Sequence, residues 1–348
     1  MELQRRTRQF ARAANETCRM VITQTPLRLS FAGGGSDLPD YYLKGAGQVI
    51  STAIDKYIFV IIKERFDDKI VLNYSRNETV DEIYEIKHEL IRAAMEMTGM
   101  NNGVEISTLA DIPSEGSGLG SSSSLVVGLL NAMYTYQGKQ VTAEQLAREA
   151  CEIEINRCGR PIGKQDQYIA AYGGLRRFSF NPDESVTESL VDLPAQALRL
   201  FGSHLMLFYT NRTRKSAEIL TEQKSQTANK REILEAMMPL VDKIEAALSV
   251  MDFEQVGRLL HVGWELKKKM AAKISDDGID SMYNRAIKAG ALGGKIAGAG
   301  GGGFLLLYVP PSHQEYVRAT LNELFELPFM PERDGSKIIF NIKRYPFK

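Results

Sequence analysis

The 348-residue sequence has few cysteines and histidines and no excess of either charge. Cys18, Cys151 and Cys158 are too few and too irregularly spaced for a disulfide framework or a zinc site, which favours a reducing, cytoplasmic compartment. The four histidines lack any spacing of the HExxH type. Lysines and arginines number 43, as do aspartates and glutamates, so the charge predicts neither a nucleic-acid nor a membrane partner. No apolar run reaches the roughly 18 residues of a membrane span. The expected partner is a small molecule.

Glycine, by contrast, is plentiful, and one glycine-rich stretch is the starting point for predicting the function of the chain. Residues 113–124 read PSEGSGLGSSSS and continue into the apolar segment LVVGLLNAMYTY. Gly116, Gly118 and Gly120 remove Cβ atoms from a turn, and the first turn of the following helix offers unpaired N–H groups, so the stretch predicts a phosphate cradle. A flexible linker would have polar sequence on both sides. A Walker A loop requires Lys, and the dinucleotide fingerprint requires Gly, where Ser121 stands.

The first patterned segment ends in a second group of glycines. Residues 21–42 read VITQTPLRLSFAGGGSDLPDYY, a strand pattern that stops at three consecutive glycines. Arg28 lies inside this predicted strand, where a charge needs a partner or a ligand. Asp37 has two interpretations, because it can cap a helix that begins at Leu38-Pro39 or accept hydrogen bonds from substrate hydroxyls.

One carboxylate lies on the apolar face of a helix predicted over residues 142–159. At about 100° per residue, Glu154 falls in the middle of the stripe that includes Leu146 and Ala150, whereas Glu152 points away. A carboxylate that faces the core needs compensation, which either a metal ion or an arginine supplies. The pattern leaves both open.

A second carboxylate follows the break after this helix, in the segment RCGRPIGKQDQYIAAYGGLRRF. Asp166 precedes an aliphatic and aromatic run and has the position of a helix N-cap. Lys164 is placed either to pair with Asp166 or to hold a phosphate. Basic residues cluster around it in the sequence, either to bind a substrate phosphate or as solvated surface charge: Arg157, Arg160, Lys164, Arg176 and Arg177.

Strand and helix patterns along the chain predict α+β packing in two domains. A turn-rich segment at residues 181–198 marks the junction between a first domain at 20–195 and a second at 196–348, and residues 1–19 form an N-terminal extension. In the first domain, strand patterns cover 48–64, 69–74 and 103–109, and a helical pattern covers 80–97.

A third glycine-rich stretch, KIAGAGGGGFLLLY, occupies residues 295–308. It contains a literal GxGxxG, yet its glycines lead into a strand instead of following one into a helix. That order rejects a dinucleotide site. It suits the close approach of a neighbouring backbone or of nucleotide phosphates.

Three stretches in this order, PLRLSFAGGGSDLP, PSEGSGLGSSSS and KIAGAGGGGF, resemble the motifs of the GHMP kinases, the family of galactokinase, homoserine kinase, mevalonate kinase and phosphomevalonate kinase. The resemblance spans residues 20–348. It implies an N-terminal domain like domain 2 of ribosomal protein S5 and a ferredoxin-like α/β sandwich as the C-terminal domain. It also implies an enzyme that uses ATP and Mg²⁺.

The resemblance assigns roles position by position. Asp166 matches the catalytic aspartate, and Arg28 matches the basic residue that polarises the acceptor oxygen. Glu154 and Ser122 match the metal ligands. The residues implied for the ATP phosphates are Glu115, Gly116, Ser117, Gly118, Leu119, Gly120, Ser121, Ser122 and Ser123. The residues implied for the substrate are Gly34, Gly35, Ser36, Asp37, Lys164, Gly300 and Gly301.

The substrate expectation comes from a departure from galactokinase. Gly34 and Gly35 stand where that enzyme has Glu and His, which leaves room and removes a negative charge, so a sugar phosphate fits better than a neutral hexose. The opening motif is most similar to that of the heptose 7-phosphate kinases, which implies transfer to the anomeric hydroxyl. A fucokinase-like enzyme and a non-catalytic sugar-sensing relative are the alternatives. The oligomeric state stays open, with a homodimer as one outcome.

Overall fold

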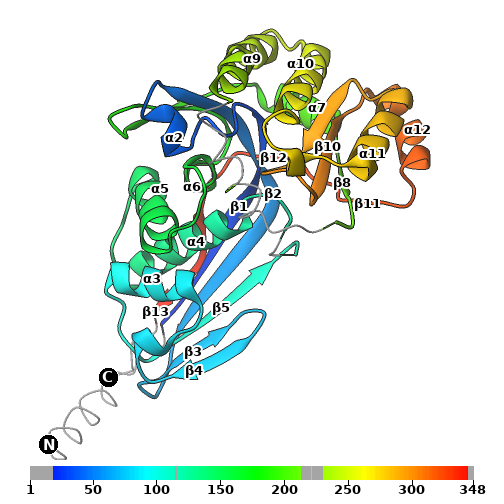
Figure 1. Ribbon diagram of the computed structural model, residues 1–348. Helices are drawn as coiled ribbons and strands as arrows, with labels where there is room; N and C mark the ends of the chain where they lie inside the picture. Colours follow the sequence, from blue (N-terminus) through cyan, green and yellow to red (C-terminus); the bar gives the residue numbers. More distant parts are fainter. Residues whose placement is uncertain (1–18, 114–115, 213–220, 222–229, 344–348) are drawn as a thin grey trace, which may run out of the picture.

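The computed structural model describes residues 19–113, 116–212, 221 and 230–343, and its described strands form two sheets (Figure 1). The first sheet follows the order β13-β1-β2-β5-β3-β4, with β6 and β12 paired to β2 and β7 paired to β6. Its strands are β1 (Arg19–Ala32), β2 (Gly47–Glu64), β3 (Ile70–Asn73), β4 (Asn77–Val80), β5 (Val104–Ala110), β6 (Leu175–Phe180), β7 (Val186–Leu190), β12 (Pro331–Glu332) and β13 (Lys337–Lys343).

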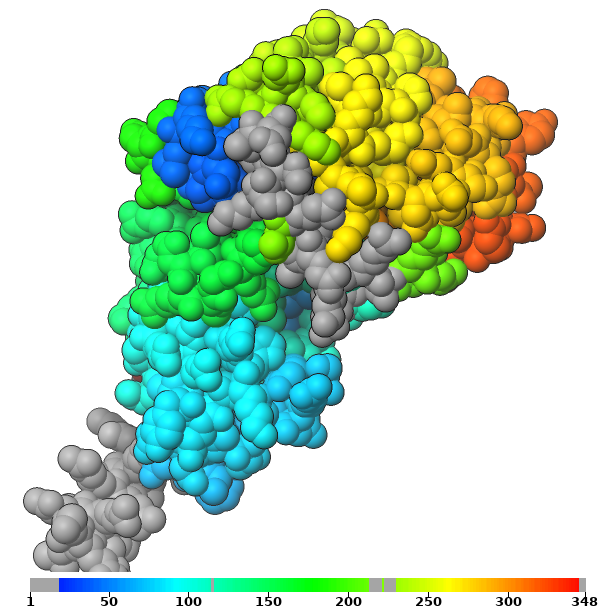
Figure 2. Space-filling model, viewed as in Figure 1, coloured from blue at the N-terminus to red at the C-terminus, as the bar shows by residue number. Residues whose placement is uncertain are grey.

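The second sheet has four antiparallel strands in the order β11-β8-β10-β9. They are β8 (Leu205–Tyr209), β9 (Gly293–Ile296), β10 (Phe304–Tyr308) and β11 (Phe325–Glu326). Helices α7 (Ala195–Ser203), α9 (Arg231–Ser249), α10 (Phe253–Lys267), α11 (Asp277–Lys288) and α12 (Gln314–Thr320) surround it. Trp264 of α10 is buried in the core on this side of the molecule. In Figure 2, α11 and α12 lie at the end of the molecule opposite α3, β3 and β4.

Helices cover one face of the first sheet (Figure 1). They are α3 (Glu89–Thr98), α4 (Ser121–Tyr136), α5 (Ala143–Cys151) and α6 (Gln165–Tyr172), with a turn of π-helix, η2 (Glu152–Arg157), continuing α5. The central helix α4 comes very close to β1, because a Cβ at Gly128 would stand 2.8 Å from Thr25 Oγ1. Thr23 Oγ1 donates to the Gly128 carbonyl at 3.1 Å. This close packing holds the middle of α4 against β1.

Strand β1 is irregular on both sides of Arg28. Its register with β2 shifts between Pro26 and Leu27 and again between Ser30 and Ala32, which are bulge-like irregularities on both sides of Arg28. Bulges bend a strand and change the direction of the side chains beside them. The short helix α2 (Pro39–Tyr42) follows the glycines at the end of β1.

The structure corrects one sequence expectation and adds a feature to the predicted domain arrangement. The helix expected over 80–97 begins only at Glu89, because residues 77–80 pair with β3 as β4 and His88 Nδ1 accepts from the Ile91 N–H as a helix cap. The predicted second domain, 196–348, also contains two strands that belong to the first sheet. Strand β12 pairs with β2, and β13 pairs antiparallel with β1, where it satisfies the backbone groups of that edge.

Two further sequence expectations concern the N-terminal extension and membrane-spanning segments. Within the expected extension at 1–19, only Arg19 belongs to the described part, where it opens β1. Among the residues that the structure describes, no helix is long and apolar enough to cross a membrane.

Candidate active site

The predicted cradle forms a turn that opens α4. Gly116, Gly118 and Gly120 all have left-handed φ angles, between 72° and 79°, which glycine adopts without strain. Gly120 is the N-cap of α4 and provides no side-chain cap, so the first-turn N–H groups remain available to an anion. Glu115, expected to bind phosphate, lies outside the described residues.

The third glycine-rich stretch packs backbone to backbone against this cradle. A Cβ at Gly118 would stand 2.4 Å from the Ala297 carbonyl oxygen, and a Cβ at Gly298 would stand 2.7 Å from the Gly118 carbonyl oxygen. The glycines therefore serve the close approach of a neighbouring backbone. Gly300 and Gly301, expected at the substrate, lie beside Ile274, and the Gly301 N–H donates to the Ile274 carbonyl at 2.8 Å.

The four serines of the cradle have separate partners. Ser121 Oγ contacts Ser117 Oγ at 3.0 Å, and Ser124 Oγ donates to the Pro26 carbonyl at 2.7 Å. Ser122 and Ser123 each donate to Glu154, both at 2.6 Å. The pair that faces Glu154 is thus distinct from the two serines that fix the turn and tie α4 to β1.

Glu154 is fully buried, as its helical phase predicted, and it lies on the π-helical turn η2. Besides the two serines, Gln167 Nε2 donates to it at 2.7 Å. Arg160 Nη1 lies 3.4 Å from Glu154 Oε1, so the arginine partner that the sequence left open makes only a long contact with this carboxylate. Burial raises the pKa of the Glu154 carboxyl, and the hydrogen bonds from the serines oppose that rise.

This carboxylate and Ser122 fit a hard divalent cation. A hydroxyl and a carboxylate are the oxygen ligands that Mg²⁺ accepts, and Mg²⁺ is commonly held by one or two such groups together with phosphate oxygens. The described residues contain no group of three His, Cys, Asp or Glu side chains placed to hold a metal ion. A cation here would need ligands from a bound nucleotide.

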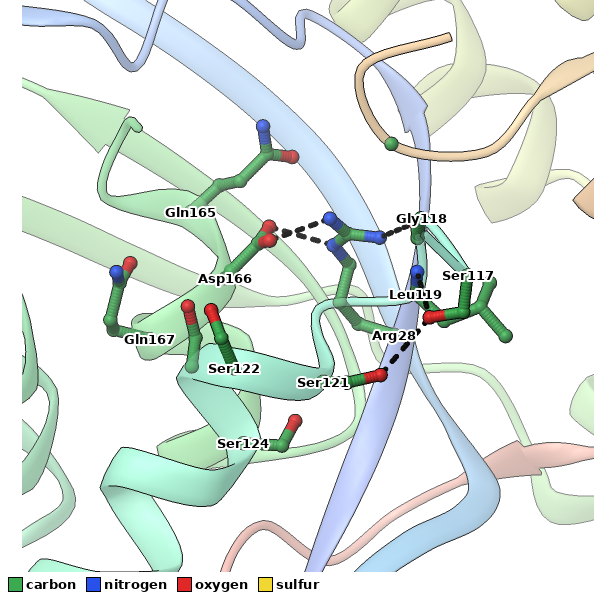
Figure 3. Close-up of polar contacts among 12 residues, drawn as sticks. Arg28, Ser117, Gly118, Leu119, Ser121, Ser122, Ser124, Gln165, Asp166 and Gln167 are labelled. Atoms are coloured by element: carbon green, nitrogen blue, oxygen red, sulfur yellow. Dashed lines mark hydrogen bonds and ion pairs between the residues drawn. The ribbon is translucent and has the colours of Figure 1, made fainter. Parts of the chain in front are cut away.

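Arg28 and Asp166 meet as a fork (Figure 3). Arg28 Nε and Nη2 donate to the two carboxylate oxygens of Asp166 at 2.7 and 2.6 Å, and Nη1 donates to the Gly118 carbonyl at 2.5 Å. The Arg28 N–H also donates to the Leu119 carbonyl at 3.0 Å. One side chain therefore joins β1, the cradle and the start of α6. Asp166 lies in the first turn of α6, while Lys164 is the N-cap residue.

Asp37 is not the cap of α2, because Leu38 takes that position. Its buried carboxylate accepts from the Gly35 N–H at 2.9 Å and from the Gln165 N–H at 3.2 Å, so it joins the end of β1 to the start of α6. Burial raises the pKa of Asp37, the Gly35 N–H lowers it, and the charge of nearby Asp166 raises it further.

Two residues expected at the substrate, Lys164 and Ser36, have partners within the protein. Lys164 donates to the Glu184 carbonyl at 3.1 Å and lies over the Tyr42 ring, so it neither pairs with Asp166 nor lines a cavity beside it. Ser36 is fully buried, where its hydroxyl bonds both backbone groups of Gln48. The other basic residues of the sequence cluster bind acidic side chains, Arg157 with Glu152, Arg176 with Glu188, and Arg177 with Asp242 and Glu245.

A small cavity of about 70 Å³ lies beside the Arg28–Asp166 fork. Gly34, Gly35 and Asp37, which the resemblance assigns to substrate binding, line it, and Gly298 and Ala299 line it from the third glycine stretch. Lys267 of α10 and Lys295 of β9 complete it, and the sequence analysis missed both. Helical phase was a usable signal for Lys267, which shares the buried face of Leu260 and Trp264.

A larger cavity of about 690 Å³ adjoins the cradle on the other side, where Ser121, Ser122 and Leu125 of α4 line it. Its size is that of a small-molecule site. Its other walls include the apolar Ile58, Leu90, Leu109, Ala110 and Ile112 and the polar or charged Tyr74, Ser75, Arg76, Lys87, His88, Glu89, Thr108 and Arg160. No sequence pattern indicated this cavity, because its walls come from six separate segments.

The chain is similar to known kinases along most of its length. It matches the GHMP kinases N terminal domain over residues 83–174 and the GHMP kinases C terminal domain over residues 242–327. It is 32% identical over 308 residues to the D-glycero-alpha-D-manno-heptose 7-phosphate kinase of Campylobacter jejuni, which covers 84% of this chain and 90% of that protein.

Solved structures agree with these matches. The crystal structure of a D-glycero-D-manno-heptose 1-phosphate kinase from Bacteroides thetaiotaomicron has a TM-score of 0.78 at 28% identity, covering 92% of this chain and 99% of that chain. A putative sugar kinase from C. jejuni has a TM-score of 0.74 at 28% identity, covering 93% and 98%. The two-domain α+β fold expected from the sequence motifs is confirmed. The chain belongs to the GHMP kinase family and is an ATP-dependent kinase that transfers a phosphoryl group to a hydroxyl.

Proposed function

We propose that this protein is a sugar kinase that phosphorylates the anomeric hydroxyl of D-glycero-α-D-manno-heptose 7-phosphate and forms the 1,7-bisphosphate. The observation that carries the proposal is the position of the Arg28–Asp166 fork. It lies between a glycine cradle at a helix N-terminus and a small polar cavity. A phosphoryl donor on one side and a hydroxyl acceptor on the other would meet at this fork.

ATP would occupy the larger cavity and the cradle. The volume of about 690 Å³ accommodates a nucleoside, and the cavity ends at Ser121 and Ser122, where α4 begins. The triphosphate would then face the free N–H groups and the positive end of the α4 dipole. The left-handed φ angles of Gly118 and Gly120 shape the turn that would present these N–H groups to the phosphates.

The acceptor hydroxyl would lie against Asp166. Each oxygen of an ionised carboxylate has two lone-pair sites, so Asp166 can accept the hydroxyl proton while it still binds Arg28. Arg28, held also by the Gly118 carbonyl, would neutralise charge that develops on the transferring phosphoryl group. Positioning and charge stabilisation supply most of the rate in such transfers.

Ser122 and Glu154 would hold Mg²⁺, which neutralises phosphate charge when it is bound. Ser122 donates its hydroxyl hydrogen to Glu154 at 2.6 Å, so the two proposed ligands already lie side by side. Gln167 and Ser123 would keep the carboxylate in place through their own hydrogen bonds. Glu154 would thereby present an oxygen toward the start of α4.

The relatives support a phosphorylated heptose as the acceptor, although they differ on its phosphate. The C. jejuni relative is named for heptose 7-phosphate and the B. thetaiotaomicron structure for heptose 1-phosphate. Gly34 and Gly35 line the acceptor cavity without adding a charge or a large side chain. That composition favours an anionic substrate over the neutral sugar of a fucokinase-like enzyme.

An acceptor panel with ATP and Mg²⁺ tests the proposal. The panel contains the heptose, its 1-phosphate and its 7-phosphate, and ³¹P NMR identifies the position of the new phosphate. We expect the highest kcat/KM with heptose 7-phosphate and a new anomeric phosphate. Equal turnover of the unphosphorylated heptose would reject the sugar-phosphate assignment. Preference for the 1-phosphate would reject the regiochemistry, and no transfer to any of the three would reject the function.

A further inference from the structure

Two buried lysines from the second half of the chain meet at the acceptor cavity. Lys267 ends α10 and Lys295 lies in β9, and each residue is only 6% exposed. Lys267 Nζ donates to the Gly298 carbonyl, and Lys295 Nζ donates to the Ser30 carbonyl at 2.8 Å. Both lysines and both of these carbonyl-bearing residues line the cavity beside Arg28 and Asp166.

The charges around this cavity do not balance. Its lining contains the cations Arg28, Lys267 and Lys295 and the carboxylates Asp37 and Asp166. Arg28 and Asp166 bind each other, and the Asp37 carboxylate is held by two backbone N–H groups. Among the described residues, no ion pair includes either lysine. Burying an ammonium group without a counter-ion is costly, so the cavity favours an incoming anion.

The pKa directions agree with this charge distribution. Burial lowers the pKa of Lys267 to about 8, and the charge of Arg28 adds to the decrease, while Asp37 and Asp166 oppose it. Burial also lowers the pKa of Lys295 well below its ordinary value, and the charges of Lys267 and Arg28 lower it further. A bound phosphate dianion would raise the pKa values of both lysines again.

We propose that Lys267 and Lys295 form the subsite for the phosphate ester that the acceptor sugar already carries, and that this subsite makes the enzyme select sugar phosphates over neutral sugars. The inference rests on the proposed function and assigns the acceptor's charged end to two named residues. A phosphate near neutral pH carries up to two negative charges, which match the two ammonium groups. A neutral sugar in the same cavity would leave both lysines without a counter-ion, so specificity follows from the buried charge.

The alternative role for these lysines is contact with the γ-phosphate of ATP. Lys267 reaches Gly298, which packs on Gly118 of the cradle, so this alternative requires a direct test. Lys295 favours the acceptor side, because it binds Ser30 near the glycines that end β1. If the lysines bind the acceptor, their loss raises the KM for the sugar phosphate. If they bind the nucleotide, their loss raises the KM for ATP.

The test compares Lys267→Met and Lys295→Met with Lys268→Met. Methionine keeps the length of the side chain without its charge, and Lys268 is the neighbour of Lys267 that pairs with Glu265 and Asp280 away from the cavity. We expect the KM for the sugar phosphate to rise at least about 30-fold in the first two variants, with the KM for ATP unchanged. We expect K268M to retain both values. A raised KM for ATP with an unchanged KM for the sugar phosphate would assign the lysines to the nucleotide and overturn the proposal.

Two further measurements separate this proposal from the proposed function and from misfolding. Calorimetric titration of the wild type and K267M with heptose 7-phosphate, without nucleotide, measures the subsite even if no transfer occurs. Binding that is lost in K267M supports the subsite, and equal binding overturns it. Thermal unfolding of each variant should stay within a few degrees of the wild type, because methionine is tolerated in a buried site better than an unpaired ammonium group. If K267M fails to fold, K295M carries the same comparison.

Discussion

Arg28 Nε and Nη2 each donate to one carboxylate oxygen of Asp166, at 2.7 and 2.6 Å, although the two residues are 138 positions apart in the chain. This bidentate pair is the point at which β1, the start of α6 and, through the Gly118 carbonyl, the glycine cradle meet. Because a guanidinium group binds a carboxylate in a fixed plane, the pair defines where both side chains lie. Replacing Asp166 by asparagine removes the negative charge from this pair.

Asp166→Asn should lower kcat by at least about 1,000-fold, because the amide cannot accept the hydroxyl proton and leaves Arg28 without its counter-ion. The KM for ATP should stay close to that of the wild type, since Asp166 lies on the acceptor side of the fork. Steady-state kinetics measure both values. Asp183→Asn, at an exposed aspartate that binds Ser185, is the matched control and should behave as wild type. Near-normal turnover of D166N would remove Asp166 from its proposed role.

Glu154→Gln should raise the Mg²⁺ concentration needed for half-maximal activity by at least about 10-fold, because the amide removes the anionic ligand. A Mg²⁺ titration at fixed ATP measures the change. Glu152→Gln is the control, since Glu152 lies on the same π-helical turn but faces Arg157 at the surface. An unchanged Mg²⁺ requirement in E154Q would assign Glu154 a purely structural role.

Gly120→Ala should lower kcat/KM by about 100-fold through misplacement of the fork. The added Cβ would stand 3.1 Å from Arg28 Cγ and 3.5 Å from Asp166 Oδ2. Gly99→Ala is a close control, because Gly99 also has a left-handed φ but open space around its missing Cβ. Both variants should lose about 1 kcal/mol in the free energy of unfolding, measured with urea, and only G120A should lose activity. Equal activity in the two variants would contradict the predicted role of Gly120.

The KM for the sugar phosphate should rise with pH above about 8, where Lys267 loses its proton and no longer attracts a phosphate. Binding requires the protonated form, so each further pH unit should raise KM up to about tenfold. Arg28, Asp37, Asp166 and Lys295 face the same cavity, so K267M, measured over the same pH range, is the control that isolates the effect of Lys267. A KM that stays constant from pH 7 to 9 in the wild type would contradict a binding role for Lys267.

Local sequence signals were sufficient for the parts of the site built on one element or one turn. The glycines of the cradle and the apolar segment after them predicted a helix N-terminus with free N–H groups, and α4 begins there. Helical phase predicted that Glu154 is buried, although the π-helical turn that carries it was not anticipated. Such signals work because backbone conformation and side-chain direction along one element depend on nearby residues.

The sequence did not predict the contacts of residues whose partners lie far along the chain. Asp37 has the sequence position of a helix cap, yet it joins Gly35 to Gln165. Lys164 is two residues from Asp166 but points to Glu184 and Tyr42. Side chains that are neighbours in the sequence of an irregular turn point in different directions, so proximity along the chain did not predict contact.

The sequence by itself determined the glycine turn that opens α4, the buried carboxylate and the α+β character of this protein, because each follows from the periodicity or backbone freedom of a short segment. Only the tertiary structure decided the rest. It placed Lys267 and Lys295 beside Arg28, packed one glycine stretch against another, and returned β13 to the edge of β1. These relationships join segments far apart in the chain, and the compensation of buried charge at the acceptor cavity depends on the packing between them.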